Sequence, residues 1–148
     1  ILPKPRRVTG RPQVVVSASF NRHLREMQRA VEEFFDVGAS VLSPISPTAY
    51  REVDGFLLLD GDRPYTNLSV RSVQGRHLRC IGDADFLWVV CPDGYVGNSV
   101  AMEVGAAVAS GVPIYAQHAP RPLMIAAYVT VVPSVTMAVL NHTTQEIF

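Results

Sequence analysis

The sequence has little cysteine, no excess of charge of either sign and no long apolar run. Its two cysteines, Cys80 and Cys91, are too few for a disulfide framework or a cysteine zinc site, and suit the reduced cytoplasm. Basic and acidic residues number 13 each, so the basic surface needed to bind a nucleic-acid polymer is missing. No apolar run reaches the roughly 18 residues of a membrane span. These absences favour a globular cytoplasmic protein whose partner is a small molecule.

The length of 148 residues matches one ordinary domain with a single core. Residues 1–12 carry Lys4, Arg6, Arg7 and Arg11 without the apolar centre of a signal peptide. We therefore expect a flexible or trimmed basic tail over 1–12, followed by a single domain over 13–148.

Short apolar runs alternate with segments of helical periodicity. We expect strands at 13–18, 40–43, 86–91, 112–116 and 128–132, and helices at 21–37, 66–82, 98–110 and after Ser134. The buried side of the first helix is predicted to hold Leu24, Met27, Val31, Phe34 and Phe35. Residues 50–65 are harder to place and are expected to form an excursion beside the site, in which GFLLL, residues 55–59, could be a further strand.

Strands that alternate with helices predict a parallel sheet with right-handed crossovers. The expected fold is an α/β, flavodoxin-like or Rossmann-like three-layer sandwich with a mainly parallel five-stranded sheet. Ligands of such folds lie beyond the carboxyl ends of the strands. The loops at 17–22 and 92–99 should therefore converge on a ligand, although 92–99 can also be an ordinary turn with Asn98 or Ser99 as N-cap.

Glu103 lies in the helix expected at 98–110, at the edge of its apolar stripe and one turn after Ser99. A carboxylate at this position is partly desolvated, and the dipole of the helix favours its ionised form. The spacing does not match a capping box, so capping explains Glu103 poorly. These features predict a functional carboxylate.

The segment DADFLWVVCPDGYVGNSVAMEVGAAVASGVPIY resembles the signature of the nucleoside 2-deoxyribosyltransferase family, whose helix carries a nucleophilic Glu matched here by Glu103. The segment VVVSASFNRH resembles the family's first loop, which wraps the sugar and, in the nucleoside 5′-monophosphate N-glycosidase branch, the phosphate. The resemblance implies cleavage or transfer at the N-glycosidic bond of a (deoxy)nucleoside or its 5′-monophosphate, with no metal or other cofactor. It also implies a homo-oligomer, for which the apolar stretch 123–140 would supply the interface.

The remaining candidate residues are assigned to substrate binding. They are Ser17, Ser19, Phe20, Arg22, His77, Asp93, Gly94, Tyr95, Gly97, Asn98 and Ser99. Ser17, Ser19 and Arg22 could donate to a phosphate near the first helix, although Arg22 could also be a solvated helix charge.

Two positions depart from the family pattern. Gly97 stands where many members carry Asp or Ser to hold the sugar, so Asn98 or Ser99 would have to substitute. His77 stands where an acidic residue often contacts the base, and a core histidine is an equal interpretation.

Two rival functions stay open. One is a phosphoribohydrolase of the cytokinin-activating kind, although its PGGxGTxxE signature is not present. The other is a non-catalytic nucleotide-binding module of the same fold.

Overall fold

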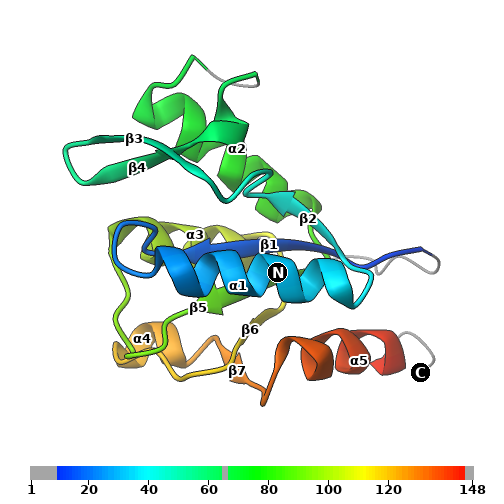
Figure 1. Cartoon of the computed structure of the whole chain (residues 1–148). Coiled ribbons are helices and arrows are strands. Elements are labelled where there is room, and N and C mark those ends of the chain that lie inside the picture. The colour runs from blue at the N-terminus through cyan, green and yellow to red at the C-terminus, as the bar shows by residue number, and fades with distance from the viewer. Residues whose placement is uncertain (1–9, 65–66, 146–148) are drawn as a thin grey trace.

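Five parallel strands form the central sheet of the computed structural model, which describes residues 10–64 and 67–145 (Figure 1). Most of the predicted basic tail, residues 1–9, lies outside the described residues. The strands are β1 (Gln13–Ala18), β2 (Ser40–Ser43), β5 (Phe86–Val90), β6 (Ile114–Ala116) and β7 (Thr130–Val131). Their spatial order is β2-β1-β5-β6-β7, with every pair parallel. This is the flavodoxin-like order, so the predicted fold class is confirmed.

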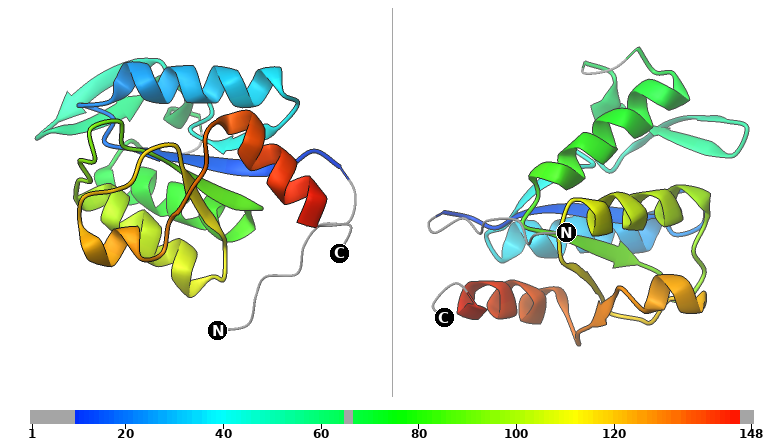
Figure 2. Two further views of the ribbon diagram at one scale, coloured as in Figure 1. Left: turned by 90° about the horizontal axis from the view of Figure 1, so that it is seen from below. Right: turned by 180° about the vertical axis from the view of Figure 1, so that it is seen from behind.

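Helices cover both faces of the sheet, which explains why the central strand β5, FLWVV, is apolar along its whole length (Figures 1 and 2). Val14, Val16, Phe86 and Trp88 pack on the face covered by α1 (Leu24–Asp36) and α5 (Val135–Gln145). The alternate residues of the same strands, such as Val15 and Leu87, face α2 (Val70–Asp83) and α3 (Asn98–Ala109). A short helix, α4 (Leu123–Ala126), precedes β7.

Residues 49–59 form an antiparallel hairpin beside α2 and apart from the central sheet (Figures 1 and 2). Its strands are β3 (Ala49–Val53) and β4 (Phe56–Leu59), and the short helix η1 (Asp60–Asp62) follows. Asp54 and Gly55 make the turn with φ values of +48° and +82°, the conformation of a two-residue type I′ hairpin. The amide of Asn21 donates to the Gly55 carbonyl over 3.0 Å, so the tip is attached to the loop after β1.

Two predicted helix starts are wrong. The first helix begins at Leu24 rather than residue 21, because the Ser19 carbonyl accepts from the backbone N–H groups of Arg22 and His23 and forms a turn there. The second begins at Val70 rather than residue 66. The Ser69 hydroxyl caps its N-terminus by accepting from Ser72 N over 3.1 Å.

Phe35 was predicted to be buried, but 76% of it is exposed. The buried stripe of α1 consists of Met27, Ala30 and Phe34, at positions i, i+3 and i+7. Phe35 follows Phe34 by about 100° around the helix and therefore points away from the sheet.

The terminal helix has the predicted cap, since the Ser134 hydroxyl accepts from Met137 N over 3.1 Å. Among the described residues, each helix is too short or too polar to cross a bilayer.

Candidate functional site

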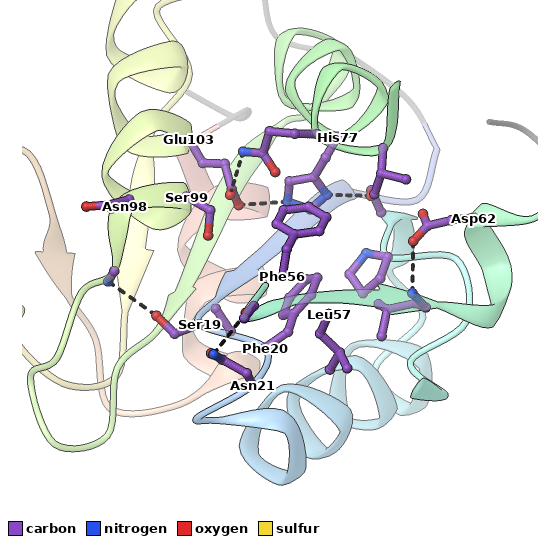
Figure 3. A pocket seen from close by; sticks show the side chains of 18 of the residues that line it. Ser19, Phe20, Asn21, Phe56, Leu57, Asp62, His77, Asn98, Ser99 and Glu103 are labelled. Atoms are coloured by element: carbon purple, nitrogen blue, oxygen red, sulfur yellow. Dashed lines mark hydrogen bonds and ion pairs between the residues drawn. The ribbon is translucent and has the colours of Figure 1, made fainter. Parts of the chain in front are cut away.

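A cavity of about 260 Å³ lies at the C-terminal ends of β1 and β2, where the fold places ligands (Figure 3). The loop after β1, the hairpin, α2 and the beginning of α3 all contribute to its lining. The loops at 17–22 and 92–99 converge as predicted, since Gly97 N donates to the Ser19 hydroxyl over 3.2 Å.

Glu103 lines this cavity with only 2% of its surface exposed, so it is more deeply buried than predicted. A buried carboxylate requires polar partners, and Glu103 has three of them. Ser17 Oγ donates to Oε1 over 2.6 Å, Gln74 Nε2 donates to Oε2 over 3.0 Å, and His77 Nε2 lies 2.8 Å from Oε1. The contact with His77 has the distance of an ion pair but not the angle of a hydrogen bond. Each carboxylate oxygen can accept two donors, so Oε2 retains acceptor capacity.

His77 is buried, and it also lines the cavity, so its contact with a base stays a prediction. It is 6% exposed, it lines the cavity, and its Nδ1 lies 2.5 Å from Ser43 Oγ. The ring also meets Phe20 edge to face at 6.2 Å. When the Ser43 hydroxyl donates to Nδ1, the proton of the imidazole is on Nε2, beside Glu103. Ser43 and Glu103 therefore lie at contact distance from the two nitrogens of the His77 ring.

Gly97 is explained by its close approach to Ser19. A Cβ at residue 97 would lie 2.9 Å from Ser19 Oγ, a distance that real Cβ atoms essentially never show. The Ser19 hydroxyl therefore occupies the space of a side chain at position 97. That Asn98 or Ser99 holds the sugar in place of such a side chain stays a prediction.

The alternative interpretation of the 92–99 loop, with Asn98 or Ser99 as N-cap of α3, is wrong. The cap residue is Gly97, whose backbone is extended, and no side chain caps this helix. Asn98 and Ser99 are instead the first helical residues, and both line the cavity.

Arg22 and Asp93 form a charged cluster beside the cavity rather than within its lining. Arg22 Nε and Nη2 both donate to Asp93 Oδ2, over 3.1 and 2.9 Å, and the guanidinium lies 4.2 Å from the centre of the Tyr95 ring. Tyr95 N and His23 Nε2 lie 3.1 and 2.9 Å from Asp93 Oδ1. The Tyr95 N–H, together with Arg22, holds the pKa of Asp93 well below its usual range. Asp93 therefore organises the 92–99 loop.

Eight of the twelve predicted site residues line the cavity. They are Ser19, Phe20, His77, Tyr95, Gly97, Asn98, Ser99 and Glu103. The other four do not. Ser17 donates to Glu103, Arg22 and Asp93 bind each other, and Gly94 lies close to the Arg121 side chain. Ser17 and Arg22 already donate to carboxylates in this arrangement, and their assignment as phosphate donors stays a prediction.

Further lining residues were not predicted. They come from the loop after β1, from the end of β2 and the residue after it, from the hairpin with η1, and from α2, and they include Asn21, Ser43, Pro44, Asp54, Gly55, Phe56, Leu57, Leu59, Asp62, Val73 and Gln74. Gln74 could have been found, because it precedes His77 by one turn and so shares its helix face. The Asp54-Gly55 pair before an apolar run was also a readable hairpin signal.

Cys91, directly after β5, should make the stability of the protein fall at alkaline pH. Its side chain is buried and donates to the His118 carbonyl, and burial together with the charge of Asp93 raises its pKa from 9.0 to about 11. Between pH 9 and 11 the unfolded chain loses this thiol proton while the folded chain keeps it. The free energy of unfolding should therefore fall as pH rises, by up to about 1.4 kcal/mol per pH unit.

Urea unfolding at pH 8 to 11 measures this effect as the difference between the native protein and Cys91→Ala. The variant should show the shallower decline. Equal slopes for the two proteins would contradict the assignment to Cys91.

No group of three or more His, Cys, Asp or Glu side chains within 10–64 and 67–145 is placed to hold a metal ion.

Neither a protein-family model nor a curated protein matches the chain. Among solved structures, the chain is similar to a conserved protein from Enterococcus faecalis V583, with 13% sequence identity and a TM-score of 0.48. The match covers 92% of this chain and 99% of that one.

Proposed function

We propose that this protein cleaves the N-glycosidic bond of a nucleoside or nucleotide, with Glu103 as the nucleophile. The observation that carries the proposal is the placement of Glu103, which is 2% exposed, lines a cavity of about 260 Å³ and is held by Ser17, Gln74 and His77. The resemblance of the 83–115 segment to the nucleoside 2-deoxyribosyltransferase signature supports the same assignment.

The two sides of the cavity suit the two parts of such a substrate. Asn98 and Ser99 lie on the same side as Glu103 and offer polar groups to sugar hydroxyls (Figure 3). Phe20, Phe56 and Leu57 lie on the other side and offer apolar and aromatic surface to a planar base (Figure 3). A nucleoside bound in this way presents its anomeric carbon between the two sides.

Glu103 would attack this carbon from the face opposite the base. A bond forms between a carboxylate oxygen and C1′, the C1′–N bond breaks, and its electron pair leaves with the base. Water or a second base then attacks C1′ and returns the carboxylate, which gives hydrolysis or transfer respectively. Ser17 and His77 would orient Oε1 throughout, because both contact that oxygen.

The test is a panel of ribonucleosides, deoxyribonucleosides and their 5′-monophosphates, each incubated with and without an acceptor base. Chromatography should detect free base from at least one substrate, or exchanged base when an acceptor is present. Release of base from none of them would refute the proposal, and binding without release would favour the non-catalytic nucleotide-binding module.

We also propose that α4 and the segment after it form a contact between copies of the chain. Leu123, Met124 and Tyr128 expose 87%, 77% and 57% of their surface close together in the sequence. Exposed apolar residues clustered in this way are typical of protein interfaces.

Light scattering after size exclusion should show an oligomer that the double substitution Leu123→Glu, Met124→Glu weakens by at least about tenfold in dissociation constant. Phe35→Glu is the matched control, because Phe35 is similarly exposed but lies on α1. An unchanged mass for the double variant, or a monomeric native protein, would contradict this interface.

A further inference from the structure

The charged side chains that line the cavity within the described residues are acidic, apart from one histidine. The carboxylates are Asp54, Asp62 and Glu103, and no Lys or Arg is among the described lining residues. His77 is the lining side chain that could carry positive charge, and its Nε2 already lies against Glu103. Three carboxylates give the lining a formal net charge of −3 when His77 is neutral, or −2 when His77 is protonated.

Arg22 and Arg63, on segments that flank the cavity, bind other groups. Arg22 pairs with Asp93 and stacks on Tyr95. Arg63 lies 3.4 Å from Asp60 and 4.6 Å from the centre of the Tyr50 ring. Neither arginine is among the described residues that line the cavity.

A 5′-phosphate fits this environment poorly. It would bring a charge of about −1.5 to −2 into a cavity that is already negative. The opposing feature is the beginning of α3 at Asn98, where the helix dipole supplies roughly half a positive charge. That half charge is smaller than the negative charge of the lining, so an unphosphorylated ligand is favoured.

The side of the cavity that suits a base combines aromatic surface with carboxylates. Phe20 and Phe56 line it, and Asp62 lies on this side, away from α3 (Figure 3). Leu59 N donates to Asp62 Oδ2 over 3.1 Å, which fixes this carboxylate. Asp54 belongs to the hairpin turn that Asn21 holds in place. Aromatic faces and carboxylates both attract a cation.

We infer that the substrate is a nucleoside that lacks a 5′-phosphate and whose base carries a positive charge. The inference rests on the proposed function and specifies its substrate class. A cationic base leaves as a neutral molecule: one Glu103 oxygen bonds to C1′, the C1′–N bond breaks, and its electron pair neutralises the positive charge of the base. No proton needs to be delivered to the leaving group. Water then attacks C1′, the carboxylate leaves, and the proton of the water passes to solvent.

The experiment crosses base charge with phosphate. The pairs are adenosine with 1-methyladenosine, and dihydronicotinamide riboside with nicotinamide riboside, each with and without a 5′-phosphate. Binding is measured by calorimetry on Glu103→Gln, because this variant should not turn the nucleoside over during the measurement. Within a pair, the cation should bind at least about tenfold more tightly than the neutral form, and each phosphate should weaken binding at least about tenfold.

Two substitutions test the source of this preference. Asp54→Asn and Asp62→Asn should each reduce the ratio of cation to neutral affinity by about threefold or more. An Asn at position 62 can still accept from Leu59 N, so the loop should be preserved. Asp36→Asn is the matched control, since Asp36 is exposed at the end of α1 and outside the cavity lining.

Tighter binding of the neutral or phosphorylated forms, or an unchanged ratio in the Asp54→Asn, Asp62→Asn double variant, would overturn the inference and leave the proposed function standing. The inference would also be overturned, and the proposed function kept, if uncharged nucleosides released their base while neither 1-methyladenosine nor nicotinamide riboside bound. If the native protein released base from no nucleoside at all, the proposed function would fail, and this inference with it.

Discussion

Glu103→Gln should lower the rate of base release by at least about a thousandfold, because the amide cannot form the bond to C1′ that the carboxylate forms. The fold should persist, since Gln has nearly the same shape. Its carbonyl oxygen can accept from Ser17, as Oε1 does in the native protein, and would lie beside His77 Nε2. Its amide can donate to the Gln74 carbonyl oxygen once that side chain flips. The loss would therefore report on chemistry rather than on packing.

Single-turnover assays with excess enzyme measure this loss, and thermal unfolding checks the fold. Glu32→Gln is the matched control, because it makes the same change on an exposed position of α1. Its rate should stay within about twofold of the native value, since isolated surface charges contribute little. A Glu103→Gln variant that retained a tenth of the native rate would exclude Glu103 as the nucleophile even if the substrate were correct.

The position of Glu103 could be predicted from the sequence, whereas its partners could not. The apolar stripe of α3 is a local pattern, so residue 103 could be placed at its edge before any fold was known. Ser17 and Gln74 are separated from Glu103 by 86 and 29 positions. They reach it because β1 pairs with β5 and α2 packs on α3. Such contacts depend on register and helix packing, which one sequence does not encode locally.

The hairpin shows a second limit of sequence patterns. All five residues of β3 are exposed, so this strand has no alternation of apolar and polar positions by which to recognise it. β4 has two buried leucines, and its apolar run was recognised as a possible strand. The cavity wall that β4 supplies was missed because its pairing partner carries no pattern of burial.

Phe34→Ala should lower the free energy of unfolding by about 3 to 5 kcal/mol, the usual loss for a buried aromatic residue. Phe34 is fully buried, and its ring lies 5.9 Å from that of Phe86 and 5.7 Å from that of Trp88. Each aromatic pair adds about 0.5 to 1.5 kcal/mol beyond the buried area. The same substitution at Phe35, which is 76% exposed, should change the free energy of unfolding by less than about 0.5 kcal/mol.

Urea unfolding followed by circular dichroism gives both values, and it avoids the fluorescence of Trp88, whose surroundings the Phe34 substitution alters. In a domain of this size, the loss at Phe34 corresponds to a fall in Tm of roughly 10 °C or more. Phe34 and Phe35 are neighbours on α1, so the two substitutions change helix propensity and remove side-chain atoms to the same extent. A difference between them therefore measures burial against the sheet. Equal losses at the two positions would contradict the packing of α1 on β5, and with it the orientation of the loop that carries Ser19 and Phe20 into the cavity.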